Sequence, residues 1–117
     1  MTIEEKIERE SPEMIRIYRE GMFWKLYNRS AFHFFQLIRP YLVKKKYMKG
    51  LQAEIVSMGF PHSVLEDMLT RLEDVSVSLE KNEEEITVWL SEPQTGYEEW
   101  FGQYSCEEKE GLGMIND

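Results

Sequence analysis

The residues best suited to bind a ligand are the cations of the stretch 39–49. This stretch places Arg39, Lys44, Lys45, Lys46 and Lys49 around two tyrosines, in the order RPYLVKKKYMK. Lysines can follow the phosphates of a nucleic acid, while aromatic rings stack on its bases. The stretch is therefore a candidate nucleic-acid contact. It also has a purely structural interpretation, because lysines on an edge strand prevent pairing with another sheet.

Groups that enzymes use are sparse. The sequence has no G-x-S-x-G motif, no Cys–His pattern of known spacing and no glycine-rich phosphate loop. We expect His33 on a solvated helix face, and we expect His62 to fix a turn rather than bind metal. Cys106 falls in an acidic segment expected to be exposed, where nearby carboxylates disfavour the thiolate. The sequence thus predicts a protein without enzymatic activity, cofactor or metal.

Composition and charge describe the class of protein. The chain has 117 residues, which suits one domain, and its net charge is −8. Residues 1–53 hold 11 basic and 6 acidic residues, whereas residues 54–117 hold 3 basic and 16 acidic ones. Residues 1–53 could face an anion and residues 54–117 a basic partner or the chain's own basic face. Alternatively, both parts are solvated surfaces. Without a long apolar run or secretory signal, and with one cysteine, we expect a cytoplasmic protein that spans no membrane and has no internal disulfide.

Hydrophobic periodicity predicts the elements that position these residues. Residues 2–10 read as a short polar helix and residues 14–19 as a strand ending at Gly21. Residues 22–38 read as an amphipathic helix that ends before Pro40. One face of this helix carries polar side chains: Lys25, Arg29, His33 and Gln36. The other carries an aromatic and aliphatic stripe: Phe23, Leu26, Tyr27, Ala31, Phe34 and Ile38.

The rest of the chain alternates strands and helices. Residues 41–48 and 53–58 read as strands and 59–62 as a turn, after which Ser63 and Glu66 form a capping box that opens a helix. Residues 75–80 and 86–90 read as a hairpin, and 97–104 as a short docking helix. We expect a mixed α+β domain, a small mixed sheet flanked by helices, over residues 1–91. Residues 92–117 are expected to form an acidic, aromatic-containing extension that is partly flexible, with residues from 107 on mobile.

Two motifs resemble a known family. Residues 17–27 (IYREGMFWKLY) are similar to a segment of the N-terminal mismatch-recognition domain, domain I, of the DNA mismatch repair protein MutS. In that family a strand ending in tyrosine-arginine and a glycine leads to an acidic residue, phenylalanine, tyrosine and glutamate. Residues 58–62 (MGFPH) resemble a second turn of the family, and a leucine-containing helix and valine-rich strand follow in both. Order and spacing agree over about residues 2–80.

The resemblance implies a DNA-binding role for specific residues. In the family the phenylalanine enters the minor groove and stacks on a mispaired base, to which the glutamate hydrogen-bonds. The corresponding residues here are Phe23 and Lys25, while Met22 occupies the acidic position. A lysine cannot accept a hydrogen bond from a base, but it can contact a phosphate. Phe23 also has a structural interpretation as part of the core, since an aromatic ring on an apolar helix face is usually buried.

Two hypotheses account for these features. The first is a free-standing MutS-like domain without an ATPase that binds mismatched or distorted double-stranded DNA. Its candidate contacts are Phe23, Lys25, Arg29, Lys44, Lys45, Lys46 and Lys49. The second is an acidic module that binds another protein, or its own basic face, through residues 54–117 and the aromatic-acidic segment 97–110. An exposed Phe23 beside the lysines favours the first hypothesis, and a buried Phe23 favours the second. The sequence leaves the oligomeric state open.

Overall fold

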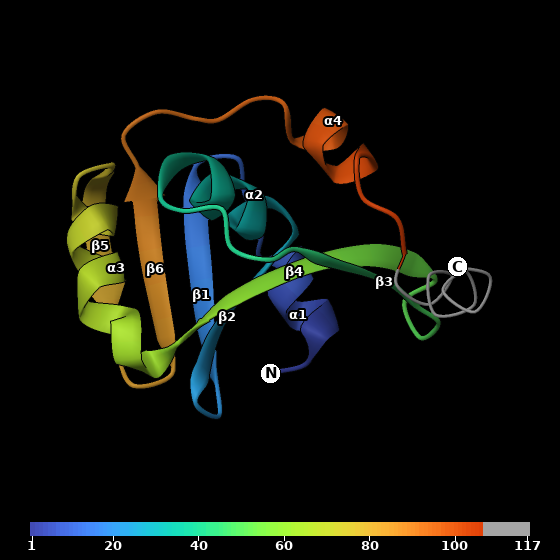
Figure 1. Cartoon of the computed structure of the whole chain (residues 1–117), viewed down its shortest axis with the longest axis horizontal. Coiled ribbons are helices and arrows are strands. Elements are labelled where there is room, and N and C mark those ends of the chain that lie inside the picture. Colours follow the sequence, from blue (N-terminus) through green and yellow to red (C-terminus); the bar gives the residue numbers. More distant parts are fainter. Residues whose placement is uncertain (107–117) are drawn as a thin grey trace.

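An antiparallel sheet forms the centre of the structure (Figure 1). The computed structural model describes residues 1–106, and within this range the sheet has six strands in the order β3-β4-β2-β1-β6-β5. The strands are β1 (Met14–Glu20), β2 (Phe23–Tyr27), β3 (Lys44–Met48), β4 (Ala53–Pro61), β5 (Ser76–Lys81) and β6 (Glu85–Leu90). The helices are α1 (Ile3–Glu8), α2 (Asn28–Leu37), α3 (Leu65–Glu73) and α4 (Tyr97–Gly102), and a 3-10 turn, η1 (His62–Val64), precedes α3. The mixed α+β class is confirmed, with every pair of these strands antiparallel where a mixed sheet was expected.

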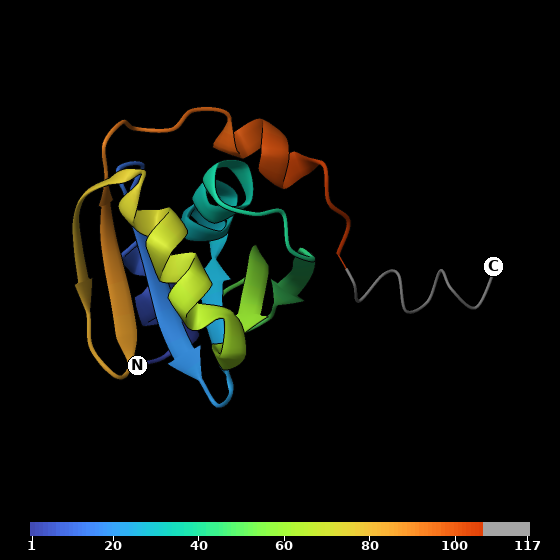
Figure 2. The ribbon, with the colours of Figure 1, turned by 60° about the vertical axis from the view of Figure 1, so that its left-hand side comes forward.

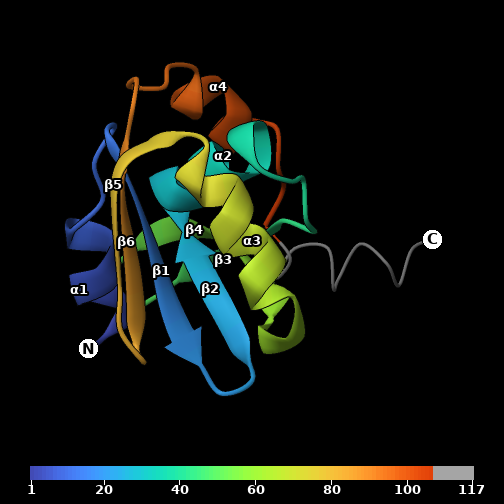
Figure 3. The same cartoon turned by 90° about the vertical axis from the view of Figure 1, so that its left-hand side faces the viewer.

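The two faces of the sheet carry different layers. α2 and α3 cover one face, here called the helical face, while α1 lies on the other, the α1 face (Figures 2 and 3). Alternate residues of the strands project onto the helical face and form the main core. Its members from the sheet are Ile15, Ile17, Trp24, Leu26, Val56, Met58, Phe60, Ile86, Val88 and Leu90. A smaller cluster under α1 contains Tyr18, Tyr27 and Ile55, against which Ile3 and Ile7 pack. No helix in the described part of the chain has the length and apolarity that a membrane crossing requires.

Several predicted elements are confirmed. The polar N-terminal helix, the strand after Pro12, the lysine-rich strand, the 75–90 hairpin and the short helix near residue 100 all form. α4 packs on α2, where Trp100 lies against Phe32 and Phe35 with ring centroids 5.4 and 5.6 Å apart. The acidic extension thus returns an aromatic helix to the domain. The predicted mobile residues 107–117 lie outside the described range.

The single helix expected over residues 22–38 is wrong in its first part. Residues 23–27 form β2, in which Trp24 and Leu26 are buried on the helical face and Phe23 and Lys25 project from the other. The helix begins only at Asn28, whose φ of 45° lies in the left-handed region that asparagine tolerates. The Asn28 side chain accepts a hydrogen bond of 3.0 Å from the Val56 amide of β4, which fixes this corner.

The expected turn at residues 59–62 and the capping box at Ser63 are also wrong. β4 continues to Pro61, because residues 59–61 pair with the first residues of β2. The next residues form η1, and α3 starts at Leu65 without a side-chain cap. The chain therefore enters α3 through a 3-10 turn, and the 3-10 backbone takes the place of the predicted cap.

Two residues that we expected to be exposed are buried. Cys106 is only 4% exposed, and its Sγ lies 2.9 Å from Oε2 of Glu54. His33 is 0% exposed, and its Nδ1 lies 3.0 Å from the carbonyl oxygen of Met14. Because a carbonyl only accepts, Nδ1 must carry the proton, and Nε2 has no hydrogen-bond partner among the described residues. The solvated face predicted for His33 is occupied by β1, against which α2 packs.

The burial of His33 predicts lower stability in acid. Burial lowers the pKa of His33 to about 4, and Arg29 adds to this effect, although the hydrogen bond to Met14 opposes it. A pKa that falls on folding gives stability that is present above about pH 6.5 and is lost as the pH approaches 4. We expect this group to remove roughly 3 kcal/mol of unfolding free energy over that interval. Urea denaturation at pH 7.0, 5.5 and 4.5 should show a smaller pH dependence in His33→Asn, which keeps a donor near Nδ1 but does not titrate. An equal pH dependence in both proteins would contradict the assignment.

Candidate nucleic-acid interface

Phe23 lies at the start of β2, directly after the tight turn that joins it to β1. Glu20 and Phe23 are paired across the hairpin, so only Gly21 and Met22 form the loop. Gly21 has a φ of 65°, and a type II′ hairpin turn requires glycine at this position. The Phe23 side chain is 50% exposed, and the hairpin projects at the bottom of the molecule in Figure 3. Phe23 is therefore displayed outward rather than packed in the core.

The hairpin is held rigidly from the helical face. Trp24 is completely buried, and its Nε1 donates a hydrogen bond of 3.1 Å to Nδ1 of His62. The backbone amide of His62 donates to the carbonyl of Met22 at 2.8 Å. His62 thus ties η1 to the start of β2. Since Phe23 lies between these two contacts, its backbone position is fixed by paired strands rather than by a free loop.

Three lysines project from the same face as Phe23. Lys25 is paired with Tyr18 and Gly59, Lys44 with Ser57, and Lys46 with Ile55. Residues paired across neighbouring strands point to the same side of a sheet. Tyr18 and Ile55 belong to the cluster under α1, so Lys25, Lys44 and Lys46 all lie on the α1 face. This places a half-exposed aromatic ring and three cations on one side of β2, β4 and β3.

The acidic side chain of Glu20 forms its ion pair with Lys6 and not with one of these three lysines. Glu20 accepts from Lys6 at 2.7 Å and from the Tyr27 hydroxyl. Burial raises the pKa of Glu20, but these hydrogen bonds and the charges of Lys6 and Lys25 outweigh it, so the pKa lies below its usual value. Within residues 1–106, Lys25, Lys44 and Lys46 form no ion pair.

A cavity of about 330 Å³, here called the notch, opens beside Phe23 on this face. The residues that line the notch are Phe23, Lys25, Leu42, Lys44, Ser57, Met58 and Gly59. Its walls carry a large exposed apolar surface, because Leu42 is 77% exposed and Phe23 50%. No carboxylate of residues 1–106 lines the notch, so its charge is positive.

Gly59 forms part of the floor of the notch, and the β2 backbone leaves no room for a side chain at this position. A Cβ at this position would lie 2.9 Å from the Trp24 carbonyl oxygen and 3.0 Å from Cδ of Lys25. The lysine stem can move, but the carbonyl belongs to the β2 backbone. We expect Gly59→Ala to lower the unfolding free energy by about 1–3 kcal/mol, as overpacking usually does. Thermal or urea denaturation measures this, with Gly50→Ala as control, since a Cβ at Gly50 meets no atom of the described chain within 4 Å. Equal stability of the two variants would contradict the expected clash.

Lys45 does not lie with the other lysines, so the structure does not place it on the face that carries Phe23. It is paired with Val56 on the helical face and is 5% exposed. Its ammonium group donates to the carbonyls of Phe101 and Tyr104 at 2.9 and 3.0 Å and lies 3.5 Å from Glu54. Lys45 therefore fastens the end of α4 to the sheet, where the chain descends from α4 toward β3 and β4 in Figure 1.

Two further candidates lie apart from the Phe23 face. Arg29 is in the first turn of α2, which packs on the helical face, and its guanidinium lies 4.8 Å from the ring centroid of Tyr97. Lys49 is exposed in the turn between β3 and β4. The structure thus brings Phe23, Lys25, Lys44 and Lys46 together on the α1 face. Lys49 lies beyond the far end of β3, and Arg29 and Lys45 lie on the helical face.

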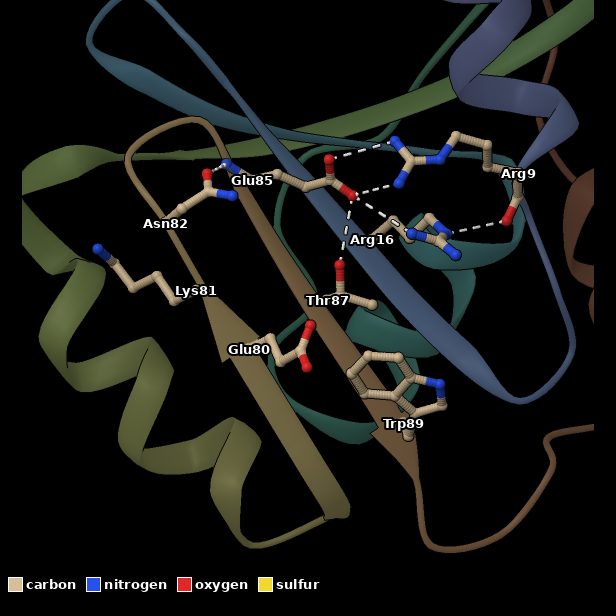
Figure 4. Close-up of a pocket in the computed structure, with 8 residues that line it drawn as sticks. All are labelled: Arg9, Arg16, Glu80, Lys81, Asn82, Glu85, Thr87 and Trp89. Carbon is tan, nitrogen blue, oxygen red and sulfur yellow. Dashed lines mark hydrogen bonds and ion pairs between the residues drawn. The ribbon is translucent and has the colours of Figure 1, made fainter.

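A larger pocket lies elsewhere on the α1 face, over β5 and β6, with a volume of about 600 Å³ (Figure 4). Glu85 is its centre and accepts from Arg9 at 2.8 and 3.2 Å and from Arg16 at 3.3 Å. Figure 4 shows Glu80 beside these strands and Lys81 pointing away from them. Both arginines are thus committed to one carboxylate, in a region that also carries acidic residues. The cations around β2–β4–β3 that form no ion pair within residues 1–106 thus differ from Arg9 and Arg16, which are paired with Glu85 of β6.

Sequence reasoning missed the residues that form the notch around Phe23. Leu42 and Ser57 belong to no motif, Gly59 was noted only as part of the turn motif of residues 58–62, and the three come together through the pairing of β2, β4 and β3. The available signal was the alternation of residues 23–27, which is typical of a strand. It would have placed Phe23 and Lys25 on one face.

Comparison with known proteins gives one informative match. No protein of curated function and no solved structure is significantly similar to this chain. The family model of MutS domain I matches residues 4–88, which include the Phe23 hairpin, the lysine strand and the 75–90 hairpin as far as Val88. This match covers most of the 117 residues. The fold agrees with the resemblance of the two sequence motifs, and the chain therefore belongs to the MutS domain I family.

Proposed function

We propose that this domain binds double-stranded DNA at mismatched or distorted steps, with Phe23 as the inserted wedge. The observation that carries the proposal is the half-exposed ring of Phe23 on a braced hairpin, on the same face as three lysines that are unpaired within residues 1–106. An apolar wedge separates stacked bases most easily where a mismatch has already weakened the step, and the duplex kinks. Lys25, Lys44 and Lys46 bind the phosphates on either side, and Lys49 extends this contact along β3.

The lysine at position 25 narrows what the domain recognises. A lysine ammonium group only donates hydrogen bonds, so it cannot replace a glutamate that accepts one from a base. Discrimination then rests on how easily a step deforms rather than on which bases are mispaired. The domain should prefer distorted over perfect duplexes, with small differences among mismatches of similar flexibility.

The alternative, an acidic module that binds another protein, has less support. The aromatic residues of 97–104 that motivated it pack within the domain: Trp100 is 7% exposed, and Tyr97, Phe101 and Tyr104 lie against the same core. Packing within the domain thus covers Trp100 and part of the surface of the other three.

The test is a fluorescence anisotropy titration of perfect and mismatched duplexes at several salt concentrations. Each phosphate contact contributes about 0.9 to the slope of log affinity against log salt. We expect Lys25→Gln, Lys44→Gln and Lys46→Gln each to reduce the magnitude of this slope by about 0.9 or less, which corresponds to the loss of at most one phosphate contact. Lys81→Gln is the matched control, because Lys81 is exposed and its ammonium group lies by Trp24, on the helical face. Absence of binding even at low salt, or equal loss in the control, would refute the proposal.

A further inference from the structure

The described part of the chain ends beside the edge strand β3, toward which it descends from α4 in Figure 1. Cys106 is 4% exposed, and its Sγ lies 2.9 Å from Oε2 of Glu54. Glu54 belongs to β4 and is paired with Tyr47 of β3. Lys45 of β3 also donates to two carbonyl groups of the segment that precedes Cys106, at 2.9 and 3.0 Å. The point from which residues 107–117 start is therefore fixed at this edge of the sheet.

Three exposed lysines follow the same edge and its turn. Within residues 1–106, β3 is paired with β4 alone, so its other edge has no strand partner there. Lys44 and Lys46 project from β3, and Lys49 lies in the turn that follows. These three lysines form no ion pair with another described residue. Their charges are thus open to a carboxylate from outside the described part of the chain.

The segment that continues from Cys106 carries the opposite charge. Residues 107–117, EEKEGLGMIND, hold four acidic residues and one lysine, a net charge of −3, and three of the acidic residues fall within the first four positions. Four residues span up to about 13 Å. Lys46 is adjacent in sequence to Tyr47, which lies opposite Glu54 and hence near Cys106, and Lys49 is two residues beyond Tyr47. The first acidic positions can therefore reach both lysines while Cys106 stays in place.

We propose that the acidic residues 107–110 dock on Lys46 and Lys49 and compete with DNA for them. The proposal rests on the proposed function, in which both lysines contact phosphates, and adds regulation of that contact by the chain itself. A segment joined to its binding site has an effective concentration of about millimolar, so even a weak ionic contact is occupied. Salt screens exposed charges, so the contact weakens as the ionic strength rises.

The first experiment tests the contact without DNA. A carbodiimide joins a carboxylate to an amino group where the two touch, and mass spectrometry of the digested monomer identifies the linked pairs. At low salt we expect links from residues 107–110 to Lys46 and Lys49, which are lost at 1 M salt, where the screening length is about 3 Å. Lys81 is exposed on β5 at the opposite edge of the sheet and gives the background for links to the same residues. Links no more frequent than those to Lys81 would overturn the proposal.

The second experiment tests the competition in the full chain. One variant neutralises the three carboxylates of the docking segment: Glu107→Gln, Glu108→Gln and Glu110→Gln. The matched control removes the same charge from exposed residues of β5 and the β5–β6 turn: Glu80→Gln, Glu83→Gln and Glu84→Gln. If the segment covers about 70–90% of the molecules, the first variant should bind duplex DNA about three- to tenfold more tightly than wild type at low salt. The control should gain about twofold or less, and high salt should remove the difference.

The outcomes separate this proposal from the proposed function. If neither wild type nor the 107–110 variant binds a duplex at low salt, the proposed function fails and the competition fails with it. If wild type binds DNA and the 107–110 variant gains no more affinity than the control, only the competition is overturned. Links to Lys46 and Lys49, together with a gain confined to the 107–110 variant, support the proposal.

Discussion

Phe23→Ala is expected to lower the preference for mismatched over perfect duplex by about 30-fold. Stacking of one base on an aromatic side chain contributes about 1–3 kcal/mol, and a loss of about 2 kcal/mol corresponds to this factor. Affinity for the perfect duplex should change little, because the lysine contacts with phosphates remain. The measurement is a pair of anisotropy titrations, with mismatched and perfect duplex, at one fixed salt concentration.

The fold should survive this substitution, which keeps the result interpretable. Phe23 is 50% exposed and lies outside both core clusters, so we expect the unfolding free energy to change by about 0.5 kcal/mol or less. Val77→Ala is the control, since Val77 is 72% exposed on β5 at the far edge of the sheet. Intact mismatch preference in Phe23→Ala would remove the wedge from the mechanism, even if DNA binding itself persists.

Lys45→Ala and Lys46→Ala are expected to have opposite effects, although the residues are adjacent. The first removes the buried donor to the Phe101 and Tyr104 carbonyls and a charge beside Glu54, whose side chain is 43% exposed. We expect a loss of about 3 kcal/mol in unfolding free energy, as when one partner of a buried polar network is removed. Lys46 is exposed on the α1 face, and its replacement should leave stability within about 0.5 kcal/mol.

DNA binding should show the reverse order. Folded Lys45→Ala should keep the salt dependence of DNA affinity seen in the wild type. In Lys46→Ala the slope of log affinity against log salt should become smaller by about 0.9, the contribution of one phosphate contact. Urea denaturation followed by tryptophan fluorescence gives the stabilities, and salt-dependent titration gives the contacts. A stable Lys45→Ala variant with weakened DNA binding would show that Lys45 leaves its buried position to reach DNA.

The sequence predicted those elements whose pattern has one interpretation. Alternation in residues 14–19, 75–80 and 86–90 allowed only strands, and the spacing of aromatic residues in 97–104 indicated a short helix, all of which form. Residues 22–38 allowed two interpretations, because a five-residue strand runs into a helix without glycine or proline between them. The break is a backbone feature, the positive φ of Asn28, stabilised by a hydrogen bond to Val56 in a strand 28 residues away. No local pattern contains that contact.

The sequence predicted the kind of site, an aromatic residue with lysines, but not which of the lysines lie on the same face as that residue. Phe23, Lys25 and the lysine strand followed from the resemblance and the composition, while the position of each lysine depends on alternation along β3. Side chains alternate along β3, so Lys45 projects onto the helical face while Lys44 and Lys46 project onto the α1 face. Lys45 is buried there because the end of α4 and the residues after it cover it, with the carbonyls of Phe101 and Tyr104 as its acceptors. Such a contact joins distant parts of the chain, so burial of one lysine among three could not be read from the sequence.

Because β2 is a central strand, its register decides whether Phe23 projects outward or into the core. β2 is hydrogen-bonded on both sides, to β1 and β4, and its side chains alternate between the two faces. A slip of one residue in register would turn Trp24 and Leu26 toward water and Phe23 and Lys25 into the core. The large cost of exposing that tryptophan therefore locks the register. Insertions or deletions of one residue in the Gly21–Met22 loop would be far more damaging than substitutions at the same place.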